Sequence, residues 1–278
     1  MKTILFPTDF SGNALYAAQY AGMLARSLNA RVVFLHVHYI PMVAEFSENK
    51  QTKMIIQNDK IEAEADMQVF VTKFIGKTNI CPDRVSFRIE YGASVTEKIL
   101  LAAKSINAHF IVMGTKGASN ILDKWLGTNA QKVMKDANCP VWIIPANATI
   151  KFPHKVMYAA DFKKDELLAT HQVLQIIEPL GATCKVIHIH DFIGMKADKK
   201  VNELVGAMKE EFKEEKFFIR NINRDDIIEG LESYINLYQP DVLALAIHEK
   251  CFLENMFNTS ITQHFIQGAN LPMLTFRK

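Results

Sequence analysis

The chain carries one pattern twice. The segment LFPTDF at residues 5–10 returns as MYAADF at residues 157–162, and VFLHVH at residues 33–38 returns as KVIHIH at residues 185–190, both with a shift of 152 positions. Later in the chain the shift is 132 positions, since Met113 corresponds to Leu245 and Pro140 to Pro272. A repeat of about 140 residues has the size of a domain and is too long for a solenoid unit. The sequence therefore predicts two tandem domains, residues 1–147 and 152–278. We expect the second to lack about twenty residues between its second strand and its later strands.

Short apolar runs alternate with helical segments in the first copy. The apolar runs predict strands at residues 4–8, 31–37, 85–90, 110–113 and 141–144. Helices are predicted at residues 13–28, over about thirty polar residues from near Val43, at 95–106 and at 129–136, with Ser11 as the first N-cap. Continuous apolar strands separated by helices favour a parallel sheet that is covered on both faces. We therefore expect an α/β fold of two tandem, open-twisted, five-stranded parallel-sheet domains.

Ligands of such sheets bind at the carboxyl ends of the strands, where the strand order switches. Asp9, Val37 and Gly114 all fall at the ends of predicted strands. These three positions therefore predict a ligand site at one edge of the first sheet.

A glycine-rich loop follows the strand at residues 110–113. In this loop two residues separate Gly114 from Gly117, and nine residues separate Gly117 from the pair Gly127-Thr128. Glycine lets the backbone approach an anion closely, and the free N–H groups of the loop and of the next helix point at the charge. Neither a Walker motif nor a G-x-G-x-x-G dinucleotide motif occurs. The loop indicates phosphate binding of another kind.

These residues resemble a known family. The G-x2-G-x9-G-[S/T] loop, the opening Pro7-Thr8-Asp9-Phe10-Ser11 and the strand ending in Leu35-His36-Val37 are similar to the ATP-binding branch of the universal stress protein family. The resemblance covers both halves of the chain. It implies a Rossmann-like fold of the adenine nucleotide alpha hydrolase type, with the two domains packed as a pseudo-two-fold pair through their last strands.

The resemblance also implies a nucleotide site in the first domain. Thr8, Asp9 and Val37 are expected beside the adenine and ribose. The loop residues expected around the ribose and phosphates are Met113, Gly114, Gly117, Ser119, Asn120, Gly127, Thr128 and Asn129. The implied ligand is ATP, with Mg²⁺ held through the phosphates because no carboxylate cluster is present to cage the ion.

The second copy departs from the glycine pattern. At the shift of 132, Gly114 becomes Ala246, Gly117 becomes Glu249 and Gly127 becomes Thr259. Only the hydroxyl of Thr128 is retained, as Ser260, while Asp161 and Ile189 repeat Asp9 and Val37. A carboxylate about 4 Å from a phosphate charge costs ~1 kcal/mol in water and ~4 kcal/mol at an effective dielectric constant near 20. We therefore expect one ATP per chain and a degenerate second domain.

Some of these residues have a second interpretation. Asp9 could cap the following helix instead of contacting a ligand. The paired histidines His36 and His38, repeated as His188 and His190, suggest metal binding, but they lie in separate domains without carboxylate or Cys partners. Hydrogen bonding within the fold is the interpretation that we favour for them.

Three functions remain open from the sequence. The first is an ATP-binding stress-response or regulatory protein, the second a slow ATP-hydrolysing enzyme, and the third a nucleotide-free dimeric interaction scaffold. No general base, arginine finger or metal cage accompanies the loop, so no catalytic residue is assigned. The glycine pattern argues against the scaffold. We expect the first function.

Composition limits the partners of the protein. The net charge of +2 gives no electrostatic case for nucleic acid or an anionic membrane, and no apolar segment approaches the ~18 residues of a membrane helix. The four cysteines are scattered, as buried free thiols of a cytoplasmic protein would be. The sequence leaves open whether two chains form a homodimer.

Overall fold

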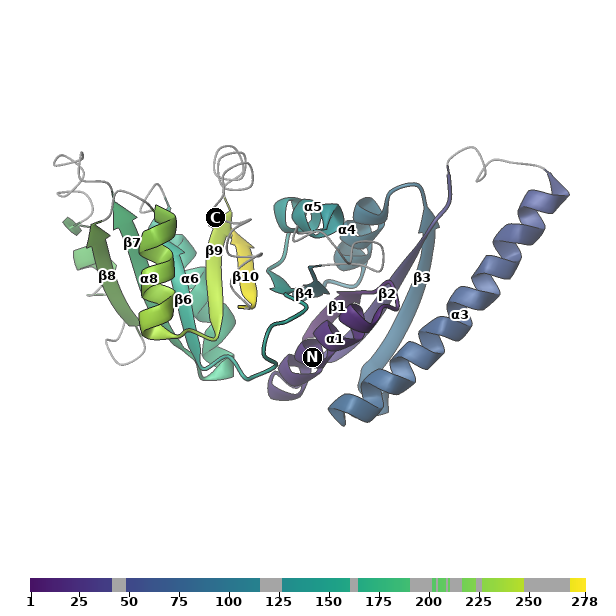
Figure 1. The fold of residues 1–278 in the computed structure, drawn as a ribbon, viewed down its shortest axis with the longest axis horizontal. Coiled ribbons are helices and arrows are strands. Elements are labelled where there is room, and N and C mark those ends of the chain that lie inside the picture. Colours follow the sequence, from purple (N-terminus) through teal and green to yellow (C-terminus); the bar gives the residue numbers. More distant parts are fainter. Residues whose placement is uncertain are drawn as a thin grey trace. The chain divides into compact units, whose positions relative to one another are not determined.

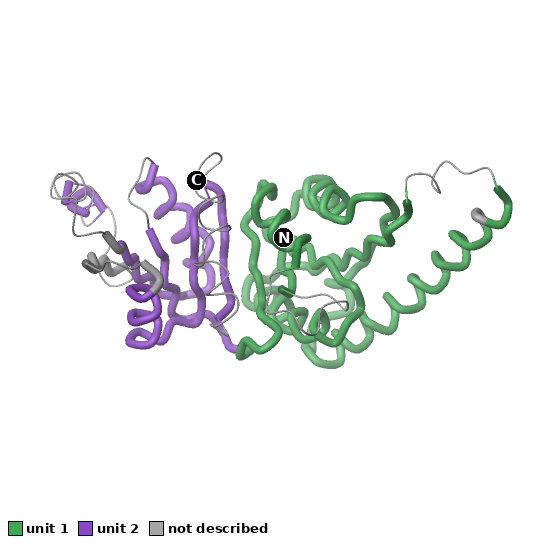
Figure 2. Tube along the Cα trace, turned by 45° about the horizontal axis from the view of Figure 1, so that its top comes forward, with its two compact units in different colours: residues 1–150 green, residues 151–278 purple. Residues whose placement is uncertain are grey.

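The computed structural model describes residues 1–41, 49–115, 127–160, 165–190, 202–203, 205–208, 210, 217–223, 227–247 and 271–278. The chain forms two compact units, Met1–Ile150 and Lys151–Lys278 (Figure 2). Each unit contains parallel strands with helices packed on them (Figure 1). How the units are arranged, including the pseudo-two-fold pair, stays a prediction.

Among its described residues, the N-terminal unit contains five parallel strands in the order β3-β2-β1-β4-β5. The strands are β1 (Thr3–Pro7), β2 (Arg31–Tyr39), β3 (Val85–Gly92), β4 (Phe110–Gly114) and β5 (Val141–Ile144). The helices are α1 (Gly12–Ser27), α3 (Lys50–Thr78), α4 (Val95–Ser105) and α5 (Thr128–Asp136), with a 3-10 turn at Pro82–Arg84. The strand order switches direction at β1 and β4. The predicted α/β fold with a parallel sheet is confirmed.

The described part of the C-terminal unit repeats this order as β8-β7-β6-β9-β10. Its strands are β6 (Lys155–Ala160), β7 (Thr183–His190), β8 (Phe217–Asn223), β9 (Val242–Ile247) and β10 (Met273–Arg277). Its helices are α6 (Glu166–Ile177) and α8 (Ile227–Tyr238), with a 3-10 turn at Glu178–Leu180. The two units therefore share one strand topology.

Strand register locates the difference in length between the two copies. Val32 of β2 pairs with Val85 of β3, and Cys184 of β7 pairs with Phe217 of β8. The first residues of these pairs are 184 − 32 = 152 positions apart, and the second residues are 217 − 85 = 132 positions apart. The missing twenty residues therefore lie between the second and third strands of the C-terminal unit. The N-terminal unit has α3 in this place.

Local capping explains where α1 and α3 begin. The Ser11 hydroxyl accepts a hydrogen bond from the amide of Ala14 at 3.1 Å, so the predicted cap of α1 is confirmed. The long polar helix runs for 29 residues, as expected, but it begins at Lys50 rather than near Val43. The Asn49 side chain caps it by accepting from the amide of Gln51. Residues 42–48 lie outside the described residues.

Aromatic side chains hold the C-terminal half of α3 on the sheet. Phe34 of β2 lies 4.8 Å from Phe74 and 5.4 Å from Phe70, measured between ring centroids, and 5.5 Å from Phe6 of β1. All four rings are buried. This cluster fixes β1, β2 and α3 relative to one another beside the edge where the strands end.

No helix in the described part of the chain combines the length and apolarity that crossing a bilayer requires. The expectation of buried thiols is met only in part. Cys184 is buried, and burial raises its pKa to about 12, whereas Cys81 is exposed. Cys139 is partly buried, with its pKa raised to about 11 by burial. Cys251 lies outside the described residues.

Candidate functional site

Three neighbouring strands of the N-terminal unit end at one edge of its sheet. Thr8 and Asp9 directly follow β1, Val37 lies near the end of β2, and Met113 and Gly114 end β4. Because the strands are parallel and adjacent, these predicted residues come together at this edge. The helices α4 and α5 begin at the same edge.

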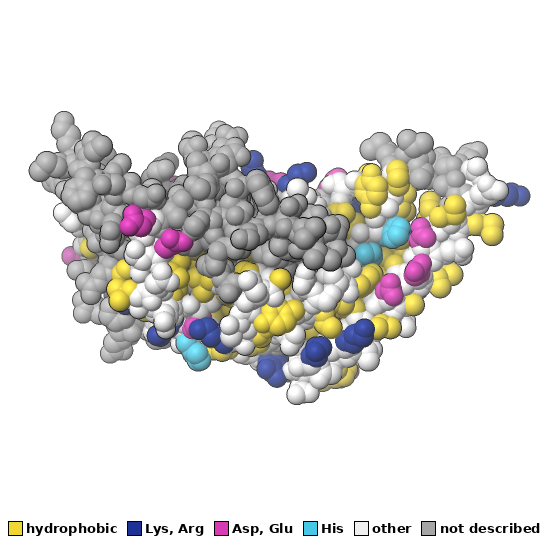
Figure 3. All heavy atoms as spheres, in the orientation of Figure 1, with side chains coloured by type: hydrophobic (Ala, Val, Ile, Leu, Met, Phe, Trp, Pro, Cys, Tyr) yellow, Lys and Arg dark blue, Asp and Glu magenta, His cyan; other side chains and the backbone are white. Residues whose placement is uncertain are grey.

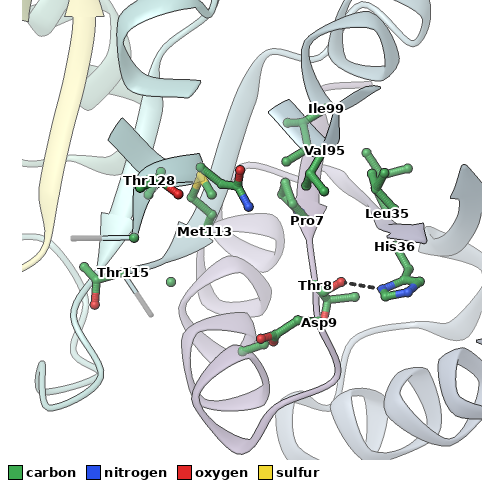
Figure 4. Close-up of a pocket in the computed structure, with 16 residues that line it drawn as sticks. Pro7, Thr8, Asp9, Leu35, His36, Val95, Ile99, Met113, Thr115 and Thr128 are labelled. Carbon is green, nitrogen blue, oxygen red and sulfur yellow. Dashed lines mark hydrogen bonds between the residues drawn. The ribbon is translucent and has the colours of Figure 1, made fainter. Parts of the chain in front are cut away.

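A cavity of about 400 Å³ opens at this point (Figure 4). That volume lies in the range of small-molecule pockets, roughly 300–1,000 Å³. Eight of the predicted residues line the cavity: Thr8, Asp9, Val37, Met113, Gly114, Gly127, Thr128 and Asn129. The other three predicted residues, Gly117, Ser119 and Asn120, lie outside the described residues.

Half of the residues that line the cavity were not predicted from the sequence. The further lining residues are Pro7, Ala14, Leu35, His36, Val95, Ile99, Thr115 and Ala130. Val95 and Ile99 sit one turn apart on α4 and supply an apolar side (Figure 4). Their spacing of four residues just after a strand end was the available signal, because side chains four apart share one face of a helix.

The side of the cavity formed by β1 and β2 is tied together by hydrogen bonds. The amide of Thr8 donates to the carbonyl of Leu35 at 2.8 Å. His36 Nδ1 lies 2.9 Å from the carbonyl oxygen of Thr8 (Figure 4). A carbonyl only accepts, so Nδ1 carries the proton and donates. Burial lowers the pKa of His36 below 6.5, against the opposing effect of the Thr8 carbonyl.

Phe10 packs on this histidine. Its ring centroid lies 4.3 Å from that of His36, with an angle of 26° between the planes. Phe10 has a φ of 64°, a left-handed conformation that costs a non-glycine residue of order 1–3 kcal/mol. The turn after β1 is therefore held in an unusual backbone shape beside the cavity.

Asp9 does not cap α1. Ser11 takes that position, and Asp9 Oδ1 instead accepts from the amide of Ser11 at 3.1 Å. This local hydrogen bond fixes the carboxylate at the start of the loop, where its side chain is exposed. The alternative interpretation of Asp9 as the helix cap is therefore wrong.

The opposite side of the cavity is the start of α5. The amide of Gly127 donates to the carbonyl of Thr115 at 2.8 Å, and a Cβ placed on Gly127 would lie 3.1 Å from the same oxygen. Glycine thus permits a close approach of two backbone segments. Gly127 is also the N-cap residue and offers no side chain to the first helical amides.

The first turn of α5 therefore presents N–H groups to the cavity. Thr128, Asn129 and Ala130 all line it, and the first helical bond begins only at Gln131, whose amide donates to the carbonyl of Gly127. The Asn129 side chain is held by the hydroxyl of Thr96, which lies 3.2 Å from Asn129 Oδ1. A helix start with uncapped amides attracts an anion.

His36 and His188 behave as hydrogen-bonding residues of the fold, and the side chain of His190 lies outside the described part of the structure. His188 Nδ1 lies 3.0 Å from the carbonyl oxygen of Ala160, which repeats the bond of His36. The expectation that these histidines lack a carboxylate partner is wrong for His38, because its Nε2 lies 3.5 Å from Asp59 Oδ2 of α3. Within the described residues, no group of three or more His, Cys, Asp or Glu side chains is arranged to hold a metal ion.

The corresponding edge of the C-terminal unit carries different residues. Ala160 stands in place of Thr8 and Ala246 in place of Gly114. Glu166 of α6 corresponds to Ala14, which lines the first cavity. Outside the described residues lie Asp161, Glu249, Thr259 and Ser260.

Glu166 is fully buried in a polar cluster. Its carboxylate accepts from the Tyr158 hydroxyl, and Lys278 Nζ lies 2.6 Å from Glu166 Oε2. Both charged side chains are buried, at 0% and 1% exposure. A carboxylate and an ammonium group thus occupy the interior of the C-terminal unit under α6.

Comparison with known proteins places these observations in one family. The sequence model of the universal stress protein family matches residues 1–145. A universal stress protein of Thermus aquaticus is 30% identical over 146 residues, which are 51% of this chain and 98% of that protein. A universal stress protein of Archaeoglobus fulgidus DSM 4304 has a crystal structure that covers 99% of this chain and 98% of its own, with a TM-score of 0.74 at 19% identity. That likeness shows the fold, over both units. A further universal stress protein, solved in complex with cAMP, covers 51% of this chain and 96% of its own at a TM-score of 0.40 and 19% identity.

Proposed function

Since the chain belongs to the universal stress protein family, we propose that its N-terminal unit binds ATP and that ATP occupancy regulates the protein in a stress response. The proposal rests on one observation above all. The uncapped N-terminus of α5 and the carboxyl ends of β1, β2 and β4 line the same 400 Å³ cavity.

The phosphates are assigned to the α5 side. The amides of Thr128, Asn129 and Ala130 and the Thr128 hydroxyl would donate to phosphate oxygens. Gly127 has no side chain that could block an anion at this helix start, and its close approach to Thr115 leaves little room for one. Gly117, Ser119 and Asn120 are proposed as further members of the loop. Mg²⁺ would bind through the phosphates, as no caging carboxylates accompany them.

The adenine and ribose are assigned to the opposite side. Leu35, Val37, Val95 and Ile99 offer apolar contact to a base. Thr8 and Asp9 follow directly after β1 and supply polar groups for the ribose. Asp9 is the one carboxylate among the described residues that line the cavity, and it is exposed. A single exposed carboxylate suits ribose contact better than activation of a water molecule.

We propose one ATP per chain. The C-terminal unit replaces Gly114 by Ala246, and it places a buried Glu166 where the N-terminal cavity has Ala14. The glycines of the phosphate loop are likewise replaced in sequence by Glu249 and Thr259. The added side chains and the carboxylate of Glu249 oppose phosphate binding, whereas the charge of Glu166 is balanced by Lys278.

Isothermal titration calorimetry with ATP and Mg²⁺ tests the proposal. We expect one site per chain for the wild type. Gly127→Asp introduces a carboxylate at the start of α5, so its affinity should fall at least ~5-fold, the equivalent of ~1 kcal/mol. Gly206→Asp is the matched control, since Gly206 has open space around it in the other unit, and it should bind as the wild type does.

The same samples separate binding from hydrolysis. We expect no phosphate release above background during incubation, and we expect ATP to protect α5 and the end of β4 from hydrogen exchange. Lack of any binding by the wild type would overturn the proposal. Two sites per chain would overturn the assignment of a single site. ATP hydrolysis by the wild type that disappears in Asp9→Asn would favour the ATP-hydrolysing enzyme instead.

A further inference from the structure

The turn after β1 lies between the cavity and α3. Thr8 and Asp9 line the cavity (Figure 4), whereas Phe10, the next residue, is not among the described residues that line it and packs toward α3. The ring centroid of Phe10 lies 6.1 Å from that of Phe70 of α3 and 4.3 Å from that of His36 of β2. Neighbouring residues of one turn therefore face the proposed ligand site and the helix.

Hydrogen bonds tie the two sides of this turn together. The amide of Phe10 donates to Thr8 Oγ1 at 3.0 Å, and the amide of Ser11 donates to Asp9 Oδ1 at 3.1 Å. Phe10 also has the left-handed φ of 64°, which persists in a non-glycine residue only where the surroundings hold it. The position of the Phe10 ring and the directions of the Thr8 and Asp9 side chains are therefore determined together.

Phe70 supports the Phe10 ring from the helix side. It is buried at 3% exposure, and its ring centroid lies 5.4 Å from that of Phe34, with an angle of 76° between the planes. Phe34 and His36 stand two residues apart on β2 and so share one face of the sheet. The Phe10 ring is thus held between a histidine that hydrogen-bonds to Thr8 and a phenylalanine that is anchored on the sheet.

Phe74 packs one turn further along α3, away from the turn after β1. Its ring is fully buried and lies 4.8 Å from that of Phe34, and a Cβ placed on Gly22 of α1 would lie 3.1 Å from it. Gly22 stands ten positions after the first residue of α1, which is about 15 Å along the helix. Both rings therefore anchor α3, but of the two it is Phe70 that reaches Phe10.

We propose that Phe70 is a positioning residue of the nucleotide site, which acts on Thr8 and Asp9 through the ring of Phe10. The inference rests on the proposed ATP site and names how that site is regulated. Coupling between two sites is reciprocal. If the packing of α3 favours the turn that receives ATP, bound ATP favours the packing of α3 by the same factor. The long helix is therefore the element that responds to ATP occupancy.

The responding helix has an exposed outer side. Met54, Ile61 and Val69 are 66%, 60% and 51% exposed there, and Figure 3 shows hydrophobic side chains along this helix at the right of the molecule. The opposite side carries the buried residues Ala63, Met67, Phe70 and Phe74. A change in how the buried side is held is thus presented on a surface of the N-terminal unit.

Isothermal titration calorimetry on matched variants tests the proposal. Phe70→Leu should weaken the binding of ATP with Mg²⁺ by ~3- to 30-fold, the range in which residues remote from a ligand alter coupling. Phe74→Leu is the matched control, because it replaces another buried ring of the same helix, and it should bind ATP as the wild type does. Urea unfolding establishes that both variants are folded under these conditions.

A double-mutant cycle tests the route through Phe10. Phe10→Leu should weaken ATP binding as Phe70→Leu does, and the double variant should bind no more weakly than either single one. In the protein without nucleotide, amide exchange measured by NMR should be faster at Phe10 and Ser11 in Phe70→Leu than in Phe74→Leu, because these two amides hold the turn.

Hydrogen exchange with saturating ATP measures the reciprocal effect. ATP should protect α5 in every variant, but it should protect α3 between Ala63 and Phe74 only where both Phe10 and Phe70 are present. A wild type that binds no ATP overturns the proposed function and, with it, this role of Phe70. ATP binding that is weakened equally in Phe70→Leu and Phe74→Leu, or in neither, overturns the positioning role alone. Additive losses in the double variant overturn the route through Phe10.

Discussion

His36 Nδ1 donates to the carbonyl oxygen of Thr8 across 2.9 Å, just where the ladder between β1 and β2 ends. The C-terminal unit repeats this bond between His188 and Ala160 at 3.0 Å. Thr8 and Ala160 differ, but the bond uses only the carbonyl, which any residue supplies. The histidine thus clamps the first strand to the second in both units, and in the N-terminal unit this clamp forms a wall of the cavity.

Acid should destabilise the N-terminal unit through His36, because protonation at Nε2 places a positive charge on a buried ring, while Nδ1 still donates to Thr8. Burial lowers the pKa of His36 below 6.5, and the nearby His38 acts in the same direction, while the Thr8 carbonyl, Asp9 and Asp66 oppose it. The unfolded chain therefore binds more protons, so stability should fall as the pH drops below about 6.5. Nitrogen-15 NMR of the imidazole at pH 7 should show a neutral ring with the proton on Nδ1.

Two variants separate the charge of this histidine from its hydrogen bond. His36→Asn can keep a donor toward Thr8 and should remove the pH dependence, whereas His36→Leu should remove the bond and cost about 0.5–1.5 kcal/mol. A protonated ring at pH 7, or a proton on Nε2, would contradict the assignment.

Breaking the buried pair of Glu166 and Lys278 should destabilise the C-terminal unit strongly. Glu166→Leu leaves an ammonium group buried without this carboxylate, which typically costs about 3–5 kcal/mol. The double variant Glu166→Leu with Lys278→Met removes both charges and should recover most of the loss. Urea unfolding of the four combinations measures the coupling. Additive losses would show that the two side chains do not depend on each other.

Asp241 should stabilise the C-terminal unit above about pH 4. Burial opposes its charge, but Lys151 and the amides of Lys155 and His154 outweigh that effect and lower the pKa of Asp241 below 3.8. Its contribution is therefore present above the unfolded pKa and is lost as the pH falls through the folded value. Asp241→Asn should cost about 1.5–3 kcal/mol at pH 7. In urea unfolding at pH 3 the variant and the wild type should differ less. A difference in unfolding free energy that is equally large at pH 3 and at pH 7 would argue against a role for the charge of Asp241.

Gly22 should tolerate no larger side chain, because α1 and α3 meet there. A Cβ on Gly22 would lie 2.6 Å from Cγ2 of Thr78 and 3.1 Å from the ring of Phe74. Gly22→Ala should therefore cost about 1–3 kcal/mol in thermal or urea unfolding. Adding Thr78→Ser removes the Cγ2 methyl and should restore part of the loss. Gly12→Ala, in open space, serves as the control; a similar loss there would point to helix propensity or the local backbone rather than crowding.

The fold could be predicted in most of its elements. Apolar runs predicted the strands of the N-terminal unit because strands buried on both faces need continuous apolar residues, and β1, β2 and β4 lie where expected. The start of α3 could not be predicted, because the apolar residues near Val43 resemble the beginning of an amphipathic helix and the sequence alone does not show which polar residue caps it. The Asn49 cap sets it instead.

The site could be predicted where the backbone determines it. Asp9, Val37, Gly114 and Gly127 follow from strand ends and from glycine, and the structure places all four at one cavity. Val95 and Ile99 were missed because the face that a helix turns toward a neighbouring strand depends on how the helix packs, which its sequence does not show. The partnership of His38 with Asp59 was missed for the same reason.

The sequence by itself determined the duplication, the strands and helices, and the glycines that allow close backbone approach, since these depend on local spacing and on residue type. Tertiary structure alone decided which side chains share a cavity, which charges are buried together and which face of α3 remains uncovered. Those relationships arise from packing between segments distant in the chain, where contact depends on helix direction and depth of burial rather than on position in the sequence.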